Sequence, residues 1–216
     1  SDVGYLLNEG GSARAFGDTT AVLVEVTQKV PLWLRVTALG TPGHGSAPRV
    51  ETSVTKMVRA LKRISETEFP VRVLQPVADM FEGIAPFQTG EDKEVFASIG
   101  HTHPSNDYLT GLKLRNPGAH ALLRNTCSIT RLEGSSKINV IPAEVHAELD
   151  CRLLPDQNPE TFLAELQTIL ERRCKIAPPF AAKMVGTMVE LQRRRASSRV
   201  FQGKHGFITP RDLFRW

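Results

Sequence analysis

A histidine between two glycines is the first feature of this sequence that could carry chemistry. His44 lies between Gly43 and Gly45, in a nine-residue stretch from Gly40 to Pro48 whose three glycines and two prolines predict a loop. Glycines leave the imidazole without local cover, and an uncovered imidazole can donate a hydrogen bond or carry a proton to a ligand. An ordinary exposed loop histidine is the alternative that the local sequence leaves open.

Two further polar residues project from predicted strands. The alternating segment from Ala143 to Leu153 places Arg152 on its polar face, where a guanidinium can hold a substrate carboxylate through two hydrogen bonds. A solvated surface arginine is the alternative. Asn139 lies between Ile138 and Val140, so its side chain is expected to point away from the side that those two residues bury.

Other candidates for chemistry are weaker. Glu9 follows an apolar segment and precedes two glycines, which is compatible with a metal ligand at a strand end, but a zinc site needs three or four ligands. His101 and His103 lie in a predicted loop with no nearby third ligand. Ser46 is not expected to form a nucleophile–base pair with His44, because neighbouring loop residues rarely face each other.

Composition describes a chain that can fold around a core. Of its 216 residues, 41% are hydrophobic and 23% charged, which excludes a disordered chain. No apolar run approaches the roughly 18 to 20 residues of a membrane-spanning helix, and no signal segment opens the chain, so the sequence leaves the compartment open. The start at Ser1, without Met, suggests a processed, trimmed or mid-protein boundary.

The charge is distributed unevenly. From Gln192 to the end, seven Lys and Arg stand against one Asp, a net charge of +6, so the remainder of this +4 chain carries −2. A near-neutral body with a basic tail does not describe a nucleic-acid-binding domain, and the change in composition near residue 190 indicates a boundary. The three cysteines are widely spaced without a CxxC, and this odd count without close pairs argues against a disulfide scaffold and a structural zinc knuckle. Cys127 and Cys151, in predicted strands, are interpreted as buried free thiols.

Hydrophobic periodicity predicts an α+β fold. The predicted strands are residues 20–28, 32–39, 126–132 and 143–153, with a short continuation at 138–140. The predicted helices lie near 52–65 and 159–173, and the stripe Val54, Met57, Val58, Leu61 and Ile64 is expected to be the apolar face of the first one. A four-stranded antiparallel sheet with both helices on one face is the economical arrangement. Residues 66–122, punctuated by prolines, are expected to form an insertion with short helices near 77–84 and 105–112.

Several segments, together and in order, resemble the ferredoxin-like dimerisation domain of zinc exopeptidases. Leu32–Pro48 (LWLRVTALGTPGHGSAP) is similar to the strand and loop that open that domain, and Ile138–Ala143 (INVIPA) with Asp150–Arg152 (DCR) resembles its later strands. Leu7–Gly11 (LNEGG) is similar to the place where the catalytic domain supplies a zinc carboxylate. The resemblance covers residues 5–175 and indicates the group of aminoacylase, vacuolar carboxypeptidase S and secreted N-acyl-amino-acid hydrolases.

The resemblance implies a role for each candidate residue. Glu9 would be a carboxylate ligand in a site for two zinc ions, although the family usually has Asp where this chain has Asn8. His44 would reach the active site of the partner subunit and stabilise the oxyanion of the tetrahedral intermediate. Asn139 and Arg152 would bind the carbonyl or the carboxylate of the substrate, an N-acyl amino acid or a short peptide.

The family's remaining catalytic residues have no counterpart in this sequence. Its His-x-Asp motif, its bridging Asp and its Glu-Glu pair with the general base precede the position of Glu9, and its last His ligand follows the dimerisation domain. We therefore expect residues 1–18 to be a remnant of the catalytic domain and 19–178 to be the dimerisation domain. Residues 190–216 resemble a stretch of midasin, a dynein-related AAA ATPase, so 179–216 is expected to be a basic tail of foreign character.

The leading hypothesis is a truncated zinc-dependent amidohydrolase or metallopeptidase that forms a homodimer through a sheet edge or its helices. With one zinc ligand left, the chain is expected neither to hold zinc stably nor to hydrolyse substrates alone. The rival hypothesis is a non-enzymatic dimerisation or adaptor module whose basic tail binds a partner. No nucleic acid partner and no membrane segment are expected.

Overall fold

The computed structural model describes residues 11–174, with only the backbone described at 171–174. The chain divides into two compact units. The first unit contains residues 1–32, 62–129 and 150–165, and the second contains 33–61, 130–149 and 166–216. The three strands of the central sheet and the two long helices each contain residues of both units.

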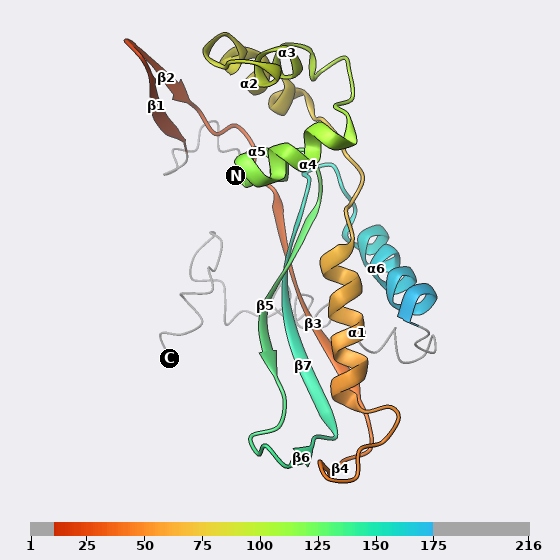
Figure 1. Ribbon diagram of the computed structural model, residues 1–216. Coiled ribbons are helices and arrows are strands. Elements are labelled where there is room, and N and C mark those ends of the chain that lie inside the picture. The colour runs from red at the N-terminus through yellow and green to blue at the C-terminus, as the bar shows by residue number, and fades with distance from the viewer. Residues whose placement is uncertain (1–10, 175–216) are drawn as a thin grey trace, which may run out of the picture. The chain divides into compact units, whose positions relative to one another are not determined.

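The central sheet of the described residues has three strands in the order β3-β7-β5 (Figure 1). Their bounds are Val30–Leu39 for β3, Thr126–Glu133 for β5 and Glu144–Leu153 for β7. Arg35 contacts Glu148 and Thr37 contacts His146, so positions rise along β3 as they fall along β7. This is the antiparallel relationship that the sequence predicts.

The predicted fourth strand does not join this sheet. Residues 20–28 overlap β2 (Thr19–Leu23), which pairs with β1 (Ser12–Phe16) in a separate antiparallel hairpin, with Phe16 opposite Thr19. Gly17 adopts a φ of +59° in the two-residue turn between them, a conformation that favours glycine and turns the chain directly back onto its neighbour. The β-branched composition thus predicted a strand that is confirmed at 20–23 only, and the expected place of this strand in the central sheet is wrong.

One face of the long strands forms the core. In β7 the residues Val145, Ala147, Leu149, Cys151 and Leu153 are buried, and the residues between them are at least partly exposed. Alternate residues of β3, from Leu32 to Ala38, are buried in the same way. This one-sided burial confirms the alternation predicted for a sheet that is covered on a single side.

The two long helices contribute apolar faces to the core. Helix α1 (Ser53–Glu66) buries Met57, Ala60, Leu61 and Ile64, and α6 (Pro159–Cys174) buries Phe162, Leu166 and Leu170. The stripe predicted for α1 is wrong at two positions, since Val54 and Val58 are 40% and 58% exposed. Ala60 is buried instead. The buried face of a helix repeats every 3.6 residues, and it includes every residue at that spacing, small or large.

The insertion of the first unit is helical around its own core. Its elements are α2 (Gln75–Ile84), η1 (Ala85–Phe87), α3 (Glu91–Ser98), α4 (Asn106–Arg115) and α5 (Pro117–Leu122). Helices α2 and α4 confirm the predicted short helices, whereas α3 and α5 were not predicted. Phe81 and Phe96 pack edge to face in the centre of this cluster, with ring centroids 4.5 Å apart. Side chains cap two of these helices, because Ser105 accepts from the N–H of Tyr108 and Asn116 from that of Ala119.

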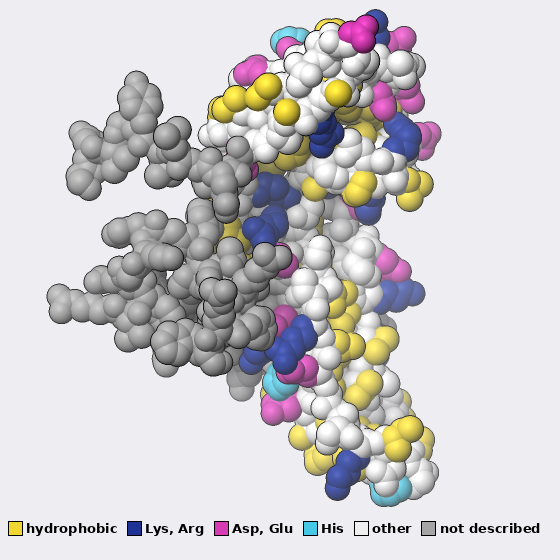
Figure 2. Space-filling model, turned by 90° about the vertical axis from the view of Figure 1, so that its left-hand side faces the viewer, with side chains coloured by type: hydrophobic (Ala, Val, Ile, Leu, Met, Phe, Trp, Pro, Cys, Tyr) yellow, Lys and Arg dark blue, Asp and Glu magenta, His cyan; other side chains and the backbone are white. Residues whose placement is uncertain are grey.

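Hydrophobic side chains also reach the surface. The face shown in Figure 2 carries hydrophobic side chains between charged ones. Among the described residues, the large exposed hydrophobic side chains include Val22, Val54 and Val58. Within residues 11–174, no helix combines the length and the apolar character that crossing a membrane requires.

Candidate functional site

A short strand pair in the second unit holds the His44 loop. Strand β4 (Gly43–His44) pairs with β6 (Val140–Ile141), and His44 lies opposite Val140. The N–H of Gly45 donates to the carbonyl of Asn139 at 2.8 Å. The structure therefore brings the predicted residues His44 and Asn139 together through their backbones. The prediction of an irregular loop at 40–48 is wrong at these two residues, because β6 pairs with them; β6 overlaps the continuation predicted at 138–140 only at Val140.

The backbone of Gly45 lies close to that of Asn139. A Cβ atom at residue 45 would lie 3.4 Å from the carbonyl oxygen of Asn139 and 3.6 Å from its carbonyl carbon, which is ordinary van der Waals contact. The backbone hydrogen bond therefore does not require glycine at this position, and the effect of Gly45 is to leave the imidazole uncovered.

The His44 ring is exposed and oriented by Ser46. The backbone N–H of Ser46 donates to Nδ1 of His44 at 3.3 Å, and the Ser46 hydroxyl oxygen lies 2.9 Å from the same atom. Because an N–H can only donate, Nδ1 is the acceptor and the proton of the neutral ring belongs on Nε2. The expectation that Ser46 and His44 would not face each other is wrong, because the chain turns at 45–46, where the N–H of Ala47 donates to the carbonyl of His44 at 3.1 Å.

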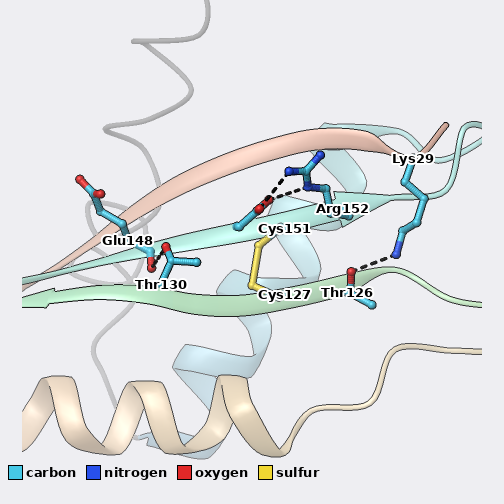
Figure 3. Close-up of a disulfide and its surroundings, with 8 residues drawn as sticks. Lys29, Thr126, Cys127, Thr130, Glu148, Cys151 and Arg152 are labelled. Atoms are coloured by element: carbon cyan, nitrogen blue, oxygen red, sulfur yellow. Dashed lines mark hydrogen bonds and ion pairs between the residues drawn. A yellow bond between two sulfur atoms is a disulfide. The ribbon is translucent and has the colours of Figure 1, made fainter. Parts of the chain in front are cut away.

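Arg152 belongs to the first unit, and its guanidinium is partly occupied. Its Nε and Nη2 donate to the two carboxylate oxygens of Asp150 at 2.7 and 3.0 Å (Figure 3). This pairing uses one edge of the planar guanidinium and leaves Nη1 to face a ligand. The structure does not place Arg152 with His44 in one unit. The fourth predicted site residue, Glu9, lies outside the described residues.

Lys29 is a charged group of the first unit that sequence reasoning missed. Its Nζ donates to the carbonyls of Ala121 and Arg124 at 3.0 and 2.8 Å and to the hydroxyl of Thr126 at 2.9 Å. Burial, and then the positive charge of Arg152, lower the pKa of Lys29 to about 8, against a smaller opposing effect of Asp150. A single lysine after a β-branched run gives no signal of such a contact across more than ninety residues.

Further buried polar side chains join the insertion to the sheet within the first unit. Arg124 is 5% exposed and donates to Glu68 at 3.0 Å, and Asn125 accepts from the N–H of Leu154 at 2.8 Å. His120 is buried beside Arg124, and burial, followed by that positive charge, lowers the pKa of its imidazole. These residues anchor structure, and no signal in the sequence distinguished them from surface residues.

Cys127 and Cys151 form a disulfide between β5 and β7 (Figure 3). The interpretation of both residues as free thiols is therefore wrong. Sequence spacing misled it, because the antiparallel pairing of β5 with β7 places residues 24 positions apart opposite each other. Thr130 and Glu148, three residues further along the same pair of strands, keep the same register, with the Thr130 hydroxyl donating to the Glu148 carbonyl at 3.1 Å.

The described residues do not form a metal site. No group of three or more His, Cys, Asp or Glu side chains within them could hold a metal ion. His101 and His103 are both exposed and belong to no such group. The donor set in this part of the chain therefore does not fit zinc, and no catalytic step is assigned to a metal bound by it.

Comparison with known families identifies the class of protein. The peptidase dimerisation domain family matches residues 26–178, and the chain belongs to this family. A second family, the midasin AAA lid domain, matches residues 165–216 and overlaps the end of the first match.

The curated proteins similar to this chain include hydrolases, which match its body, and midasin, which matches a shorter stretch. The N-fatty-acyl-amino acid synthase/hydrolase PM20D1 of Mus musculus is 32% identical over 147 residues, which are 62% of this chain and 26% of that protein. Aminoacylase-1 of Sus scrofa is 27% identical over 165 residues, 76% of this chain and 30% of its own length. Midasin of Dictyostelium discoideum is 55% identical over 53 residues, 24% of this chain and 1% of midasin. The chain thus spans less than a third of the length of these hydrolase relatives.

A solved structure of an M20 family metallo-carboxypeptidase, Sso-CP2 from Sulfolobus solfataricus, is also similar to this chain. It superimposes with a TM-score of 0.43 at 18% identity, covering 68% of this chain and 40% of that one. Human carnosine dipeptidase 1 superimposes with a TM-score of 0.41 at 13% identity, covering 70% and 36%.

Proposed function

We propose that this chain is the dimerisation-domain portion of a zinc-dependent amidohydrolase or metallopeptidase. Its function there is to pair two subunits and to present His44 to the active site of the partner. In this proposal residues 1–18 are the end of a catalytic domain, 19–178 the dimerisation domain and 179–216 a basic tail of foreign character. The proposed substrates are N-acyl amino acids or short peptides, and the names of two relatives, a fatty-acyl-amino acid synthase/hydrolase and an aminoacylase, support the first of these.

The observation that carries the proposal is the orientation of His44. The ring is exposed, Nδ1 is engaged by Ser46, and no hydrogen bond to Nε2 exists among the described residues. The neutral ring therefore offers an Nε2–H donor that its own unit does not use. A donor fixed in this way costs no reorganisation when negative charge develops on a carbonyl oxygen in the transition state.

The other candidate residues complete this assignment. Asn139, whose backbone is fixed on the His44 loop, would donate from its exposed amide to the carbonyl of the scissile bond. Arg152 would bind the free carboxylate of the substrate with the part of its guanidinium that Asp150 leaves open. Glu9 would supply one zinc carboxylate. Zinc, when bound by a complete ligand set, polarises the scissile carbonyl and lowers the pKa of its bound water.

This assignment makes the separate chain inactive. We expect the purified chain to bind added zinc weakly at best. We also expect it not to hydrolyse N-acyl amino acids when zinc is present. Titration with zinc and an assay of N-acetyl amino acid hydrolysis measure both quantities. Turnover by the metal-loaded chain would contradict the proposal.

The outward face of α1 is the proposed contact with a second copy. Val54 and Val58 lie four residues apart, on one side of the helix, and both are exposed. Because both valines are already partly buried, removing their remaining exposed surface from water contributes less than the roughly 1.5–3 kcal/mol of a fully buried apolar side chain. Two such pairs related by a twofold axis would give a self-complementary apolar contact of the kind expected for a dimerisation domain.

Subunit complementation tests the role of His44 across the dimer. In a full-length enzyme that carries this loop, one subunit receives His44→Ala and the other loses its general base. If His44 acts on the partner, one cleft of the mixed dimer has neither lesion, and activity returns to about half that of the unmodified dimer. If His44 serves its own subunit, every cleft carries a lesion and the mixed dimer stays inactive.

One observation favours a second candidate, a non-enzymatic adaptor. Residues 165–216 match the midasin AAA lid domain, whereas residues 26–178 match the peptidase dimerisation domain, so the C-terminal part is similar to a different family from the rest of the chain. In this alternative the dimerisation fold persists and the basic tail binds an acidic partner. Zinc binding together with hydrolysis by the full-length gene product would exclude the adaptor.

A further inference from the structure

The two residues of the disulfide differ in burial. Its two residues lie opposite each other on β5 and β7, and β5 is the outer of these strands in the order β3-β7-β5. Cys151 is 0% exposed and belongs to the row of β7 residues that forms the core. Cys127, on the outer strand, is only partly buried. The two cysteines of one bond therefore differ in exposure, with Cys151 fully buried and Cys127 partly exposed.

We propose that Cys127 is a site of thiol–disulfide exchange, at which a low-molecular-weight thiol forms a mixed disulfide while Cys151 is released as a buried thiol. Exchange requires an attacking sulfur to approach one sulfur of the bond along the S–S axis, so access decides which sulfur is attacked. This inference rests on the two strands alone and is independent of the proposed hydrolase function.

The reaction balances with a thiol as the single co-reactant. The thiolate sulfur bonds to Sγ of Cys127, the S–S bond breaks, and its electron pair leaves on Sγ of Cys151, which takes up a proton from water. A second thiol attacks the mixed disulfide at the sulfur of the small molecule, which frees Cys127 as a thiol and releases the oxidised small disulfide. The protein disulfide is reduced and two thiols are oxidised.

The disulfide lies beside two other interactions that exchange at Cys127 would affect. Cys127 follows Thr126, which accepts the hydrogen bond from Lys29, and Cys151 lies between the paired residues Asp150 and Arg152. Figure 3 shows Lys29, Thr126 and Arg152 near the disulfide. Exchange at Cys127 therefore removes the covalent link between β5 and β7 next to the Asp150–Arg152 pair.

Peptide mapping of the chain treated with glutathione tests the proposal. The protein carries Cys174→Ser so that no third thiol interferes, is purified in air without reductant, and is then exposed to graded glutathione and quenched with acid. We expect an intact Cys127–Cys151 disulfide before treatment. After treatment we expect at least about tenfold more glutathione on Cys127 than on Cys151. Equal labelling, labelling mainly of Cys151, or two free thiols before treatment would each overturn the proposal.

Single-cysteine variants provide a second measurement that does not depend on exchange. In the Cys174→Ser background, Cys151→Ser leaves Cys127 alone, and Cys127→Ser leaves Cys151 alone. With iodoacetamide under native conditions, Cys127 should be alkylated at least about tenfold faster than Cys151. After unfolding in guanidinium chloride the two rates should become similar. Fast native alkylation of Cys151 in a variant that keeps the circular dichroism of the parent would contradict the difference in access.

Discussion

The backbone N–H of Ser46 donates to Nδ1 of His44 at 3.3 Å, and the Ser46 hydroxyl oxygen lies 2.9 Å from the same nitrogen. This contact between two residues of one tight loop determines which ring nitrogen of the neutral imidazole carries the proton. It leaves an exposed Nε2–H as the part of His44 that can interact with another molecule. The chemical role proposed for this loop follows from that orientation.

The first prediction concerns turnover in a full-length enzyme that carries this loop. His44→Ala should lower kcat by about a hundredfold, equivalent to roughly 3 kcal/mol, because one donor to the developing oxyanion is lost. The KM should change little, since the charge appears only in the transition state. Ser46→Ala is the matched control and should cost far less, because the backbone N–H of residue 46 remains. A loss confined to KM would contradict the oxyanion role.

A second prediction concerns the ion pair between Glu68 and buried Arg124. Glu68→Gln should lower the free energy of unfolding by roughly 1–2 kcal/mol, because the buried guanidinium loses its anion, while the half-exposed position of Glu68 limits the cost. Glu66→Gln is the control, since Glu66 and Glu68 are 50% and 51% exposed but Glu66 meets only the exposed Lys62 and Arg63. Its effect should stay within about 0.5 kcal/mol in urea titrations.

The pH dependence of this pair follows from its charges. Hydrogen bonds from Lys113 and then Arg124 hold the pKa of Glu68 below its ordinary value. The stabilisation is therefore present above the ordinary pKa of a glutamate and is lost as the pH falls through the folded-state pKa. Equal destabilisation by Glu68→Gln at neutral pH and well below that pKa would show that the charge of Glu68 is not responsible.

A third prediction uses the lowered pKa of Lys29. Because this pKa is about 8 in the folded chain against 10.5 ordinarily, the unfolded chain binds the proton more tightly between these values. Lys29 therefore makes the free energy of unfolding rise as the pH increases from about 8 to 10.5. Lys29→Met should abolish this rise, and Lys137→Met, at an exposed lysine, should retain it. Urea titrations across this range decide the matter, and identical pH profiles for all three proteins would refute the assignment.

A fourth prediction concerns the stability that the disulfide contributes. Its two residues are 24 positions apart, and closing a loop of this length in the unfolded chain stabilises the native state by about 3 kcal/mol. Cys127→Ser with Cys151→Ser should lose about this amount in guanidinium titrations run without reductant. Adding reductant should bring the parent close to the variant and leave the variant unchanged. A parent that is insensitive to reductant would indicate that the bond is absent in solution.

Local patterns predicted the elements of this fold well. Alternation identified β7 and β3 with their buried faces, helical periodicity identified α1 and α6, and the short helices expected in the insertion coincide with α2 and α4. Pairing between distant segments was harder to infer, because one strand pattern fits any open sheet edge. The segment at residues 20–28 therefore pairs with β1 instead of with the central sheet, and α1 turns Val54 and Val58 outward.

In the candidate site, too, features set by neighbouring residues could be predicted, whereas contacts between segments far apart in the chain could not. The glycines around His44 indicated an uncovered ring, and the structure adds the Ser46 contact and the pairing with the Asn139 segment. The partner of Arg152 is two residues away in sequence, yet strand geometry was needed to show that Asp150 occupies one edge of its guanidinium. Lys29 and the disulfide depend on contacts between segments far apart in the chain, for which one sequence contains no signal.

Sedimentation equilibrium of the purified chain tests most directly whether it pairs with itself through α1. We expect a dimer at micromolar concentration, and we expect Val58→Lys to be monomeric because it places a charge in the centre of the proposed contact. Val22→Lys makes the same change at a 71% exposed valine of β2 and should remain dimeric. A parent that stays monomeric at the highest concentration, or a Val58→Lys chain that dimerises as strongly as the parent, would contradict the account.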